Sequence, residues 1–190
     1  MDLPEPEGPI RATNSFLKKE LINYGIDLIE QAGSILVDSI KSGGKILWCG
    51  NGGSASQANH LSAELTGGMY KSKKSPFKSL CLNVDTSFIT AWSNDDSYDN
   101  IFVRQLDSLS ERNDLIVLLS TSGNSKNLIN AAKFAQEKGL KVLSLTGSDG
   151  GFLKDYSDIN INIDSNSTQR IQEMHILIGH IICDILENSF

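Results

Sequence analysis

The chain has 190 residues and a formal net charge of -6, with 39% hydrophobic and 21% charged residues, which is typical of one globular domain. Its pI is near 5.0, so it offers no basic field to a nucleic-acid backbone, and we expect no nucleic acid as its main partner. The three cysteines lack the spacing of a structural zinc site and the density of a disulfide scaffold, which fits a reducing cytoplasm.

The first 13 residues, MDLPEPEGPIRAT, are acidic and contain three of the four prolines. They resemble neither a secretory signal nor a transit peptide, so we expect no membrane partner and predict a flexible arm over residues 1–13. From about Asn14 to Ile40, apolar residues recur at helical spacing and predict a long amphipathic helix or a pair of helices. The wide apolar stripe suits packing against another subunit, and equally suits packing over the chain's own sheet.

The stretch from Lys45 to Met69 predicts a strand, a glycine turn and a helix. Its apolar start suits a strand buried on both faces, and Gly50, Gly52 and Gly53 allow a sharp turn that approaches a ligand closely. Ser54 follows where the helix begins, so an anion there would meet unpaired backbone N–H groups and the positive end of the helix dipole. The pattern predicts a phosphate cradle, although an ordinary α/β crossover would show it too.

His60 and Glu64 lie four residues apart on this predicted helix, which puts them on one face with Cβ atoms about 6 Å apart. They follow the glycine turn by one to two helical turns, so one ligand could touch both features. The alternative is a solvated i,i+4 pair that binds nothing.

A second strand is predicted from Ser79 to Val84, and Asp85 begins a helix that leads to Ile89 and Trp92. Residues 93–96, Ser-Asn-Asp-Asp, interrupt the helical pattern. Their side chains suit the hydroxyls of a polyol, and equally suit a plain turn.

The strongest signal for a buried strand is the run DLIVLL from Asp114 to Leu119. A serine-rich loop follows it, and a helical pattern runs from Lys126 to Lys138. A glycine, several hydroxyls and a helix N-terminus within six residues favour a phosphate monoester, although Ser and Thr at a helix start can also serve the helix alone. The hydroxyls belong to Ser120, Thr121, Ser122 and Ser125.

Two more strands, from Lys141 to Leu145 and from Ile159 to Ile163, and a last helix from Thr168 to about Asn188 complete the predicted elements. The alternation of strands and helices predicts an α/β fold with a doubly wound parallel sheet of five strands. Ligands bind at the carboxyl ends of the strands in such folds. The last helix carries Gln172 and His180 about 12 Å apart along its axis, so they share a site only by leaning toward a common group or serve sites of different subunits.

Five motifs, in this order along the chain, resemble those of the SIS-domain (sugar isomerase) family, and within it the phosphoheptose isomerases. They are GNGGS at 50–54, HLSAEL at 60–65, STSGNS at 120–125, LTGSDGG at 145–151 and RIQEMHILIGH at 170–180. The resemblance covers residues 14–190 as a single domain. It implies an αβα sandwich with a long N-terminal helix, a homotetramer with sites between subunits, and conversion of sedoheptulose 7-phosphate to a heptose phosphate through an enediolate.

The resemblance also implies the site residues. Glu64 and His180 are the acid/base pair, and a zinc ion is held by His60, Glu64, Gln172 and His180, a mixed N and O set that suits zinc. The substrate is bound by Asn51, Gly52, Gly53, Ser54, Glu64, Asn94, Asp95, Ser120, Thr121, Ser122, Ser125 and Gln172.

Two departures from the family pattern stand out. The family commonly has arginine after the glycine that follows Glu-Leu, whereas this chain has Gly68; Lys71 is a candidate substitute. Gln169 stands where some members carry an acidic residue, so that position supplies no further base. The alternatives to an enzyme are a non-enzymatic SIS adaptor similar to the bacterial protein that associates with the replication initiator, and a sugar-phosphate sensor. That adaptor lacks a histidine at the position of His180, which favours the enzyme.

Overall fold

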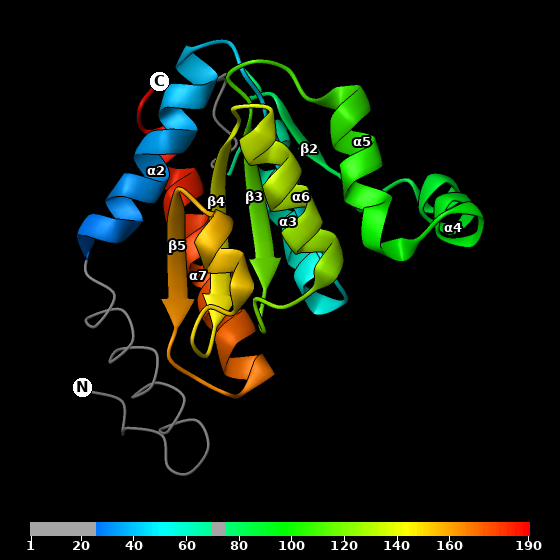
Figure 1. Ribbon diagram of the computed structural model, residues 1–190. Coiled ribbons are helices and arrows are strands. Elements are labelled where there is room, and N and C mark those ends of the chain that lie inside the picture. The colour runs from blue at the N-terminus through cyan, green and yellow to red at the C-terminus, as the bar shows by residue number, and fades with distance from the viewer. Residues whose placement is uncertain (1–25, 70–74) are drawn as a thin grey trace.

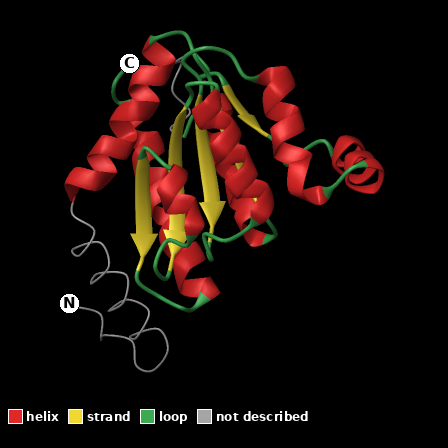
Figure 2. Ribbon diagram, viewed as in Figure 1, coloured by secondary structure: helices red, strands yellow, loops and turns green. Residues whose placement is uncertain are grey.

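A parallel sheet of five strands forms the centre of the molecule, in the order β2-β1-β3-β4-β5. The computed structural model describes residues 26–69 and 75–190. Figures 1 and 2 show the strands side by side with helices on both faces of the sheet. The strands are β1 (Ile46–Gly50), β2 (Ser79–Cys81), β3 (Leu115–Ser120), β4 (Lys141–Gly147) and β5 (Ile159–Ile163).

The helices divide between the two faces according to the side chains that they bury. The first face is covered by α2 (Ile26–Lys41), α3 (Gly53–Gly67) and α7 (Thr168–Glu187), and the second by α5 (Ile101–Leu109) and α6 (Lys126–Glu137). Helix α4 (Thr86–Asp95) packs against α5 on the side away from the strands (Figure 1). Two short 3-10 helices, η1 (Tyr98–Asn100) and η2 (Phe152–Tyr156), join these elements.

Strand β1 shows why both faces need a cover. Its side chains alternate, with Ile46 and Trp48 in the core under α2, α3 and α7, and Leu47 and Cys49 in the core under α5 and α6. All five of its residues are buried, as expected for a central parallel strand. The structure therefore confirms the predicted αβα sandwich.

Helices α3 and α7 pack side by side and run in the same direction, since each returns from the carboxyl edge of the sheet. Gly179 permits their close approach, because a Cβ there would lie 2.4 Å from a methyl carbon of Leu61. At the far end of the pair, Oε1 of Glu187 accepts the backbone N–H of Met69 at 2.8 Å. Successive turns of α3 therefore face successive turns of α7.

Some of the predicted boundaries are wrong. Strand β2 ends at Cys81 rather than Val84, because the Asn83 side chain turns back and exchanges two hydrogen bonds with the backbone of Gly50, at 2.9 and 3.1 Å. The residues Ser93 to Asp95 do not interrupt a helix but form the last turn of α4. The helix start at Asp85 is confirmed, since its side chain accepts the N–H of Phe88. Helix α5 was not predicted.

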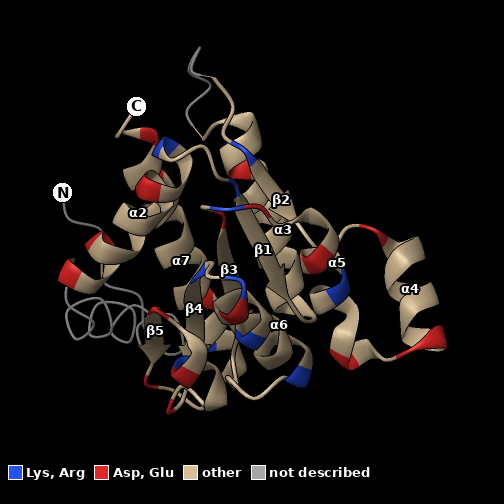
Figure 3. Ribbon diagram, turned by 45° about the horizontal axis from the view of Figure 1, so that its top comes forward, with Lys and Arg blue, Asp and Glu red and all other residues tan. Residues whose placement is uncertain are grey.

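The predicted N-terminal helix is described from Ile26 onward, and its earlier part and the arm over 1–13 lie outside the described residues. The described part, α2, packs over its own chain: a Cβ on Gly33 would lie within 2.7 Å of Ile185 of α7. Charged residues of both signs are scattered over the surrounding helices and loops (Figure 3). Within the described ranges, no helix has both the length and the apolar character needed to cross a bilayer.

Candidate active site

The loops after β1 and β3 meet at the carboxyl edge of the sheet, where the winding direction reverses. Strand β1 continues through α3 on one face to the neighbouring β2, and β3 continues through α6 on the other face to β4. Such a reversal leaves a crevice between the two loops, which is where doubly wound folds bind ligands. The glycine turn and the serine-rich loop that the sequence singled out are these two loops.

The glycine turn is shaped by its contact with α7. Gly52 caps α3 with a φ of 56°, and a Cβ on Gly53 would lie 2.5 Å from Nε2 of Gln172. The Gln172 carbonyl also accepts a hydrogen bond of 2.6 Å from the side chain of Gln57. Ser54 is buried in the first turn of α3. The structure therefore brings Gln172 to the glycine turn, among the predicted substrate-binding residues.

The serine-rich loop is supported by the glycines that follow β4. Gly123 has a φ of 63°, and a Cβ there would lie 2.0 Å from the carbonyl oxygen of Gly150. Asn124 joins the same two loops by accepting the N–H of Phe152 at 3.1 Å. This packing explains why glycines recur at 150–151 and fixes the loop before α6.

The loop also keeps hydroxyl groups available. Ser125 is the N-cap residue of α6, and its side chain makes no capping hydrogen bond. Ser122 accepts the N–H of Asn124 at 3.1 Å and so retains its own hydrogen for donation. Ser120 is buried and accepts the N–H of Gly123. The arrangement offers hydroxyls and a helix N-terminus to an anion.

Three of the four predicted metal ligands converge between α3 and α7. The Nε2 atoms of His60 and His180 are 2.8 Å apart, and Oε1 of Glu64 lies 3.6 Å from Nε2 of His60. One candidate ligand atom from each of the three residues lies within 4.8 Å of the others. The fourth predicted ligand, Gln172, lies at the glycine turn, about two helical turns before His180. Packing of α3 on α7 therefore joins residues more than a hundred positions apart.

The remaining predicted substrate residues, Asn94 and Asp95, lie exposed at the end of α4. The hydrogen bond that they make links them to each other, from Nδ2 of Asn94 to Oδ1 of Asp95 at 2.9 Å. Tyr98, a few residues further on, is the residue of this segment that reaches the first loop. Its hydroxyl lies 2.8 Å from Oδ1 of Asn51.

Sequence reasoning missed two residues at this crevice, Tyr98 and Asn127. The Asn127 side chain is buried and exchanges two hydrogen bonds of 2.9 Å with Asn51. Asn127 follows the serine-rich loop by two positions, so an amide at the start of α6 was the available signal. Nothing local marked Tyr98, whose partner is 47 residues away.

His175 belongs to the core and not to the site. Its Nε2 donates to the carbonyl of Thr146 at 3.0 Å, and burial lowers its pKa from 6.5 to about 4. The folded state therefore binds fewer protons than the unfolded state between pH 4 and 6.5, so stability falls as the pH falls through this window.

Between pH 7 and 5 the free energy of unfolding should fall by roughly 2 kcal/mol because of His175. His175→Gln should remain active, and its stability should depend less on pH over this range. Thermal unfolding of both proteins at pH 7 and pH 5 measures this. The same loss of stability in the variant as in the native protein would contradict the role of His175.

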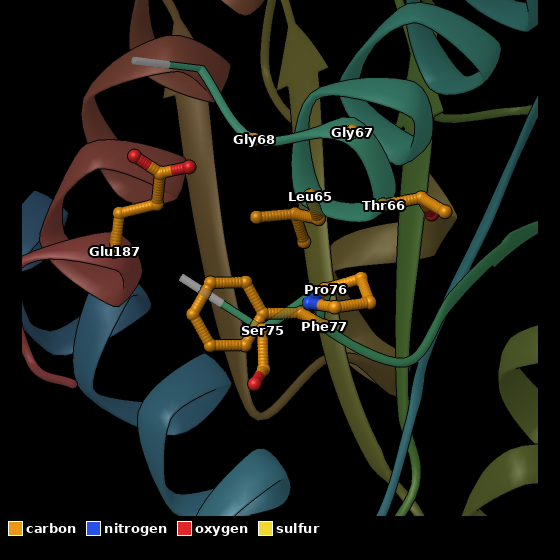
Figure 4. A pocket seen from close by; sticks show the side chains of 8 residues that line it. All are labelled: Leu65, Thr66, Gly67, Gly68, Ser75, Pro76, Phe77 and Glu187. Atoms are coloured by element: carbon orange, nitrogen blue, oxygen red, sulfur yellow. The ribbon is translucent and has the colours of Figure 1, made fainter. Parts of the chain in front are cut away.

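A separate hollow of about 160 Å³ lies at the other end of α3. Figure 4 shows it between Leu65 to Gly67 of that helix, its C-cap residue Gly68, the segment from Ser75 to Phe77, and Glu187 of α7. The C-terminal end of α3 faces the edge of the sheet opposite to the glycine turn. This hollow is therefore not part of the candidate site.

Comparisons with known proteins agree with this geometry. The model of the SIS domain family matches residues 12–147, which places the fold among the SIS domains. A phosphoheptose isomerase of Aliarcobacter butzleri (strain RM4018) is 50% identical over 161 residues, 85% of each chain. The solved phosphoheptose isomerase from Neisseria gonorrhoeae superposes with a TM-score of 0.83 at 37% identity, over 93% of this chain and 92% of that one. The one from Francisella tularensis superposes with a TM-score of 0.86 at 31% identity, over 96% of this chain and 100% of that one. The chain belongs to the SIS-domain family and, within it, to the phosphoheptose isomerases.

Proposed function

We infer that this chain interconverts the ketose sedoheptulose 7-phosphate and the aldose D-glycero-D-manno-heptose 7-phosphate, a reaction of heptose biosynthesis. The observation that carries the inference is the convergence of His60, Glu64 and His180 between α3 and α7, on the helix that begins at the glycine turn and on its neighbour. Similarity to a phosphoheptose isomerase at 50% identity supports the same reaction.

The substrate is held at one end by its phosphate. Ser120, Thr121, Ser122 and Ser125 surround the phosphate with neutral donors at the start of α6, and Asn51, Gly52, Gly53 and Gln172 contact the sugar. The reacting carbons then lie toward His60, which α3 places about 10 Å from the glycine turn. A chain of several carbons spans such a separation.

Glu64 acts as the base that moves a proton between C1 and C2 through an enediolate. His180 moves protons on the sugar oxygens or opens the ring. In protein without a bound ion, the 2.8 Å contact between Nε2 of His60 and Nε2 of His180 requires that one ring donates and the other accepts. An ion held by both Nε2 atoms would replace that proton.

The same residues fit a zinc ion. Tetrahedral zinc holds ligand atoms about 2.0–2.2 Å away, so neighbouring ligands lie about 3.3 Å apart. The separations of 2.8 Å between the histidines and 3.6 Å between His60 and Glu64 fall on either side of that value. His60, Glu64 and His180 would hold the ion, and Gln172, at the glycine turn, is the fourth ligand that the family resemblance implies. A bound zinc ion would supply Lewis-acid stabilisation of negative charge on the sugar oxygens.

We further propose a cytoplasmic homotetramer with sites between subunits, built from a domain over residues 14–190. The imidazole of His60 is about half exposed, with 48% of its side-chain surface accessible, so the His–Glu–His group lies open to a neighbouring subunit. Light scattering at micromolar concentration should give four times the chain mass of 20.7 kDa. A monomer would contradict both the tetramer and the shared site.

The direct test is incubation with sedoheptulose 7-phosphate, with aldose formation followed by proton NMR. Turnover confirms the enzyme. Binding of the sugar phosphate without turnover, in protein loaded with zinc, would instead indicate a sensor. Absence of both binding and turnover would favour the hypothesis of a non-enzymatic SIS adaptor.

A further inference from the structure

A chain of hydrogen bonds runs from the backbone of α6 to the phenol of Tyr98, and its first donor fixes all the others. The backbone N–H of Leu128, which also donates to the carbonyl of Ser125 at 3.1 Å, can only donate, so the atom of the Asn127 side chain 3.0 Å from it is Oδ1 and not Nδ2. Asn127 is 2% exposed, so its amide is held in this orientation away from water. Its Nδ2 must then face Asn51.

The orientation of Asn51 follows from that of Asn127. The two amides pair reciprocally at 2.9 Å, with Nδ2 of each donating to Oδ1 of the other. The Oδ1 of Asn51 has a second contact, 2.8 Å from the Tyr98 hydroxyl. Because that oxygen can only accept, Tyr98 must donate its single hydrogen to it.

Among the residues that the structure describes, two hydrogen-bonding groups at this crevice have no further partner. Asn51 keeps its second Nδ2 hydrogen, and the Tyr98 oxygen keeps lone pairs but has no hydrogen left. Tyr98 is 47% exposed, so its hydroxyl is accessible. Its helical turn η1 is fastened to α6 by a hydrogen bond of 3.1 Å from Asn130 to the Asp99 carbonyl.

We propose that Tyr98 is a substrate-binding residue, whose phenol oxygen accepts a hydrogen bond from a sugar hydroxyl while Asn51 donates to a sugar oxygen. This rests on the proposed function and deepens it. A hydroxyl group can both give and receive a hydrogen bond, so a polyol satisfies Tyr98 and Asn51 together. A fully ionised phosphate has no hydrogen to offer Tyr98 and gains nothing from it. Tyr98 therefore selects for the polyol part of the ligand. Asn127 is a positioning residue, because it sets which groups of Asn51 and Tyr98 donate and which accept.

The test compares the native protein with Tyr98→Phe, which keeps the ring and removes the oxygen. Calorimetry should show affinity for sedoheptulose 7-phosphate reduced about tenfold, the effect of one neutral hydrogen bond, and affinity for inorganic phosphate unchanged. Tyr156→Phe is the matched control, because that ring lies in η2 beneath the ammonium group of Lys133. It should bind both ligands as the native protein does.

A series of monodeoxy sugar phosphates separates direct contact from an indirect effect through Asn51. For one of them, loss of the hydroxyl should weaken binding to the native protein about tenfold and leave binding to Tyr98→Phe unchanged. Equal penalties in both proteins for every analogue would overturn the proposal, as would unchanged affinity of Tyr98→Phe for the full substrate. These readings are of binding alone, so absence of turnover in the native protein would refute the isomerase and leave the result for Tyr98 standing.

Discussion

Glu64→Gln should retain the fold and the binding of sugar phosphate and lose at least about a hundredfold of its turnover. The amide matches the carboxylate in size but lacks the basicity needed to remove a proton from carbon. Glu64 leaves 26% of its side chain exposed and approaches His60 no closer than 3.6 Å, so thermal unfolding should change little. Proton NMR of aldose formation gives the rate, and calorimetry gives the affinity.

His180→Ala should show a similar loss of turnover. His175→Gln provides the control, since His175 lies on the buried face of the same helix, α7. The metal content of each purified variant separates loss of a base from loss of an ion. An inactive Glu64→Gln with native metal content assigns the defect to the missing base. A native rate in Glu64→Gln would refute the catalytic role and favour a binding module.

Local patterns predicted most of the fold. The buried runs of β3 and β4 and the apolar residues that recur at helical spacing in α7 are strong signals. A strand covered on both faces and a helix in the core leave few polar positions. Helix α5 was missed because it is short and follows the polar segment 93–100. Strand β2 was made too long because its end depends on the bonds between Asn83 and Gly50, 33 residues apart.

The candidate site was predictable only where its parts share one element. His60 and Glu64 lie on one helix, so a spacing of four brought them together. The approach of His180 depends on how α3 packs on α7, which a glycine facing Leu61 permits. Helical spacing carries no information about that contact, and the motif resemblance supplied it. The pairing of Asn51 with Asn127 joins two loops 76 residues apart and left no periodic signal.

The serine-rich loop should carry most of the affinity for phosphate. Ser125→Ala should weaken sugar phosphate binding about ten- to a hundredfold, since a hydrogen bond to a charged group contributes roughly 1.5–3 kcal/mol. The structure makes this a clean substitution, because the Ser125 side chain does not cap α6. The melting temperature should therefore stay near the native value, and calorimetry should detect the loss.

Adding Ser122→Ala should weaken binding further, and inorganic phosphate should lose affinity in parallel with the sugar phosphate. This parallel loss distinguishes the loop from Tyr98, whose removal should spare inorganic phosphate. Ser34→Ala is a suitable control, since that hydroxyl donates to the carbonyl of Glu30 on the exposed side of α2. If the double variant bound both ligands as tightly as the native protein, the phosphate would have to lie elsewhere. The glycine turn before α3, with its own helix N-terminus, would then be the remaining anion site of the crevice.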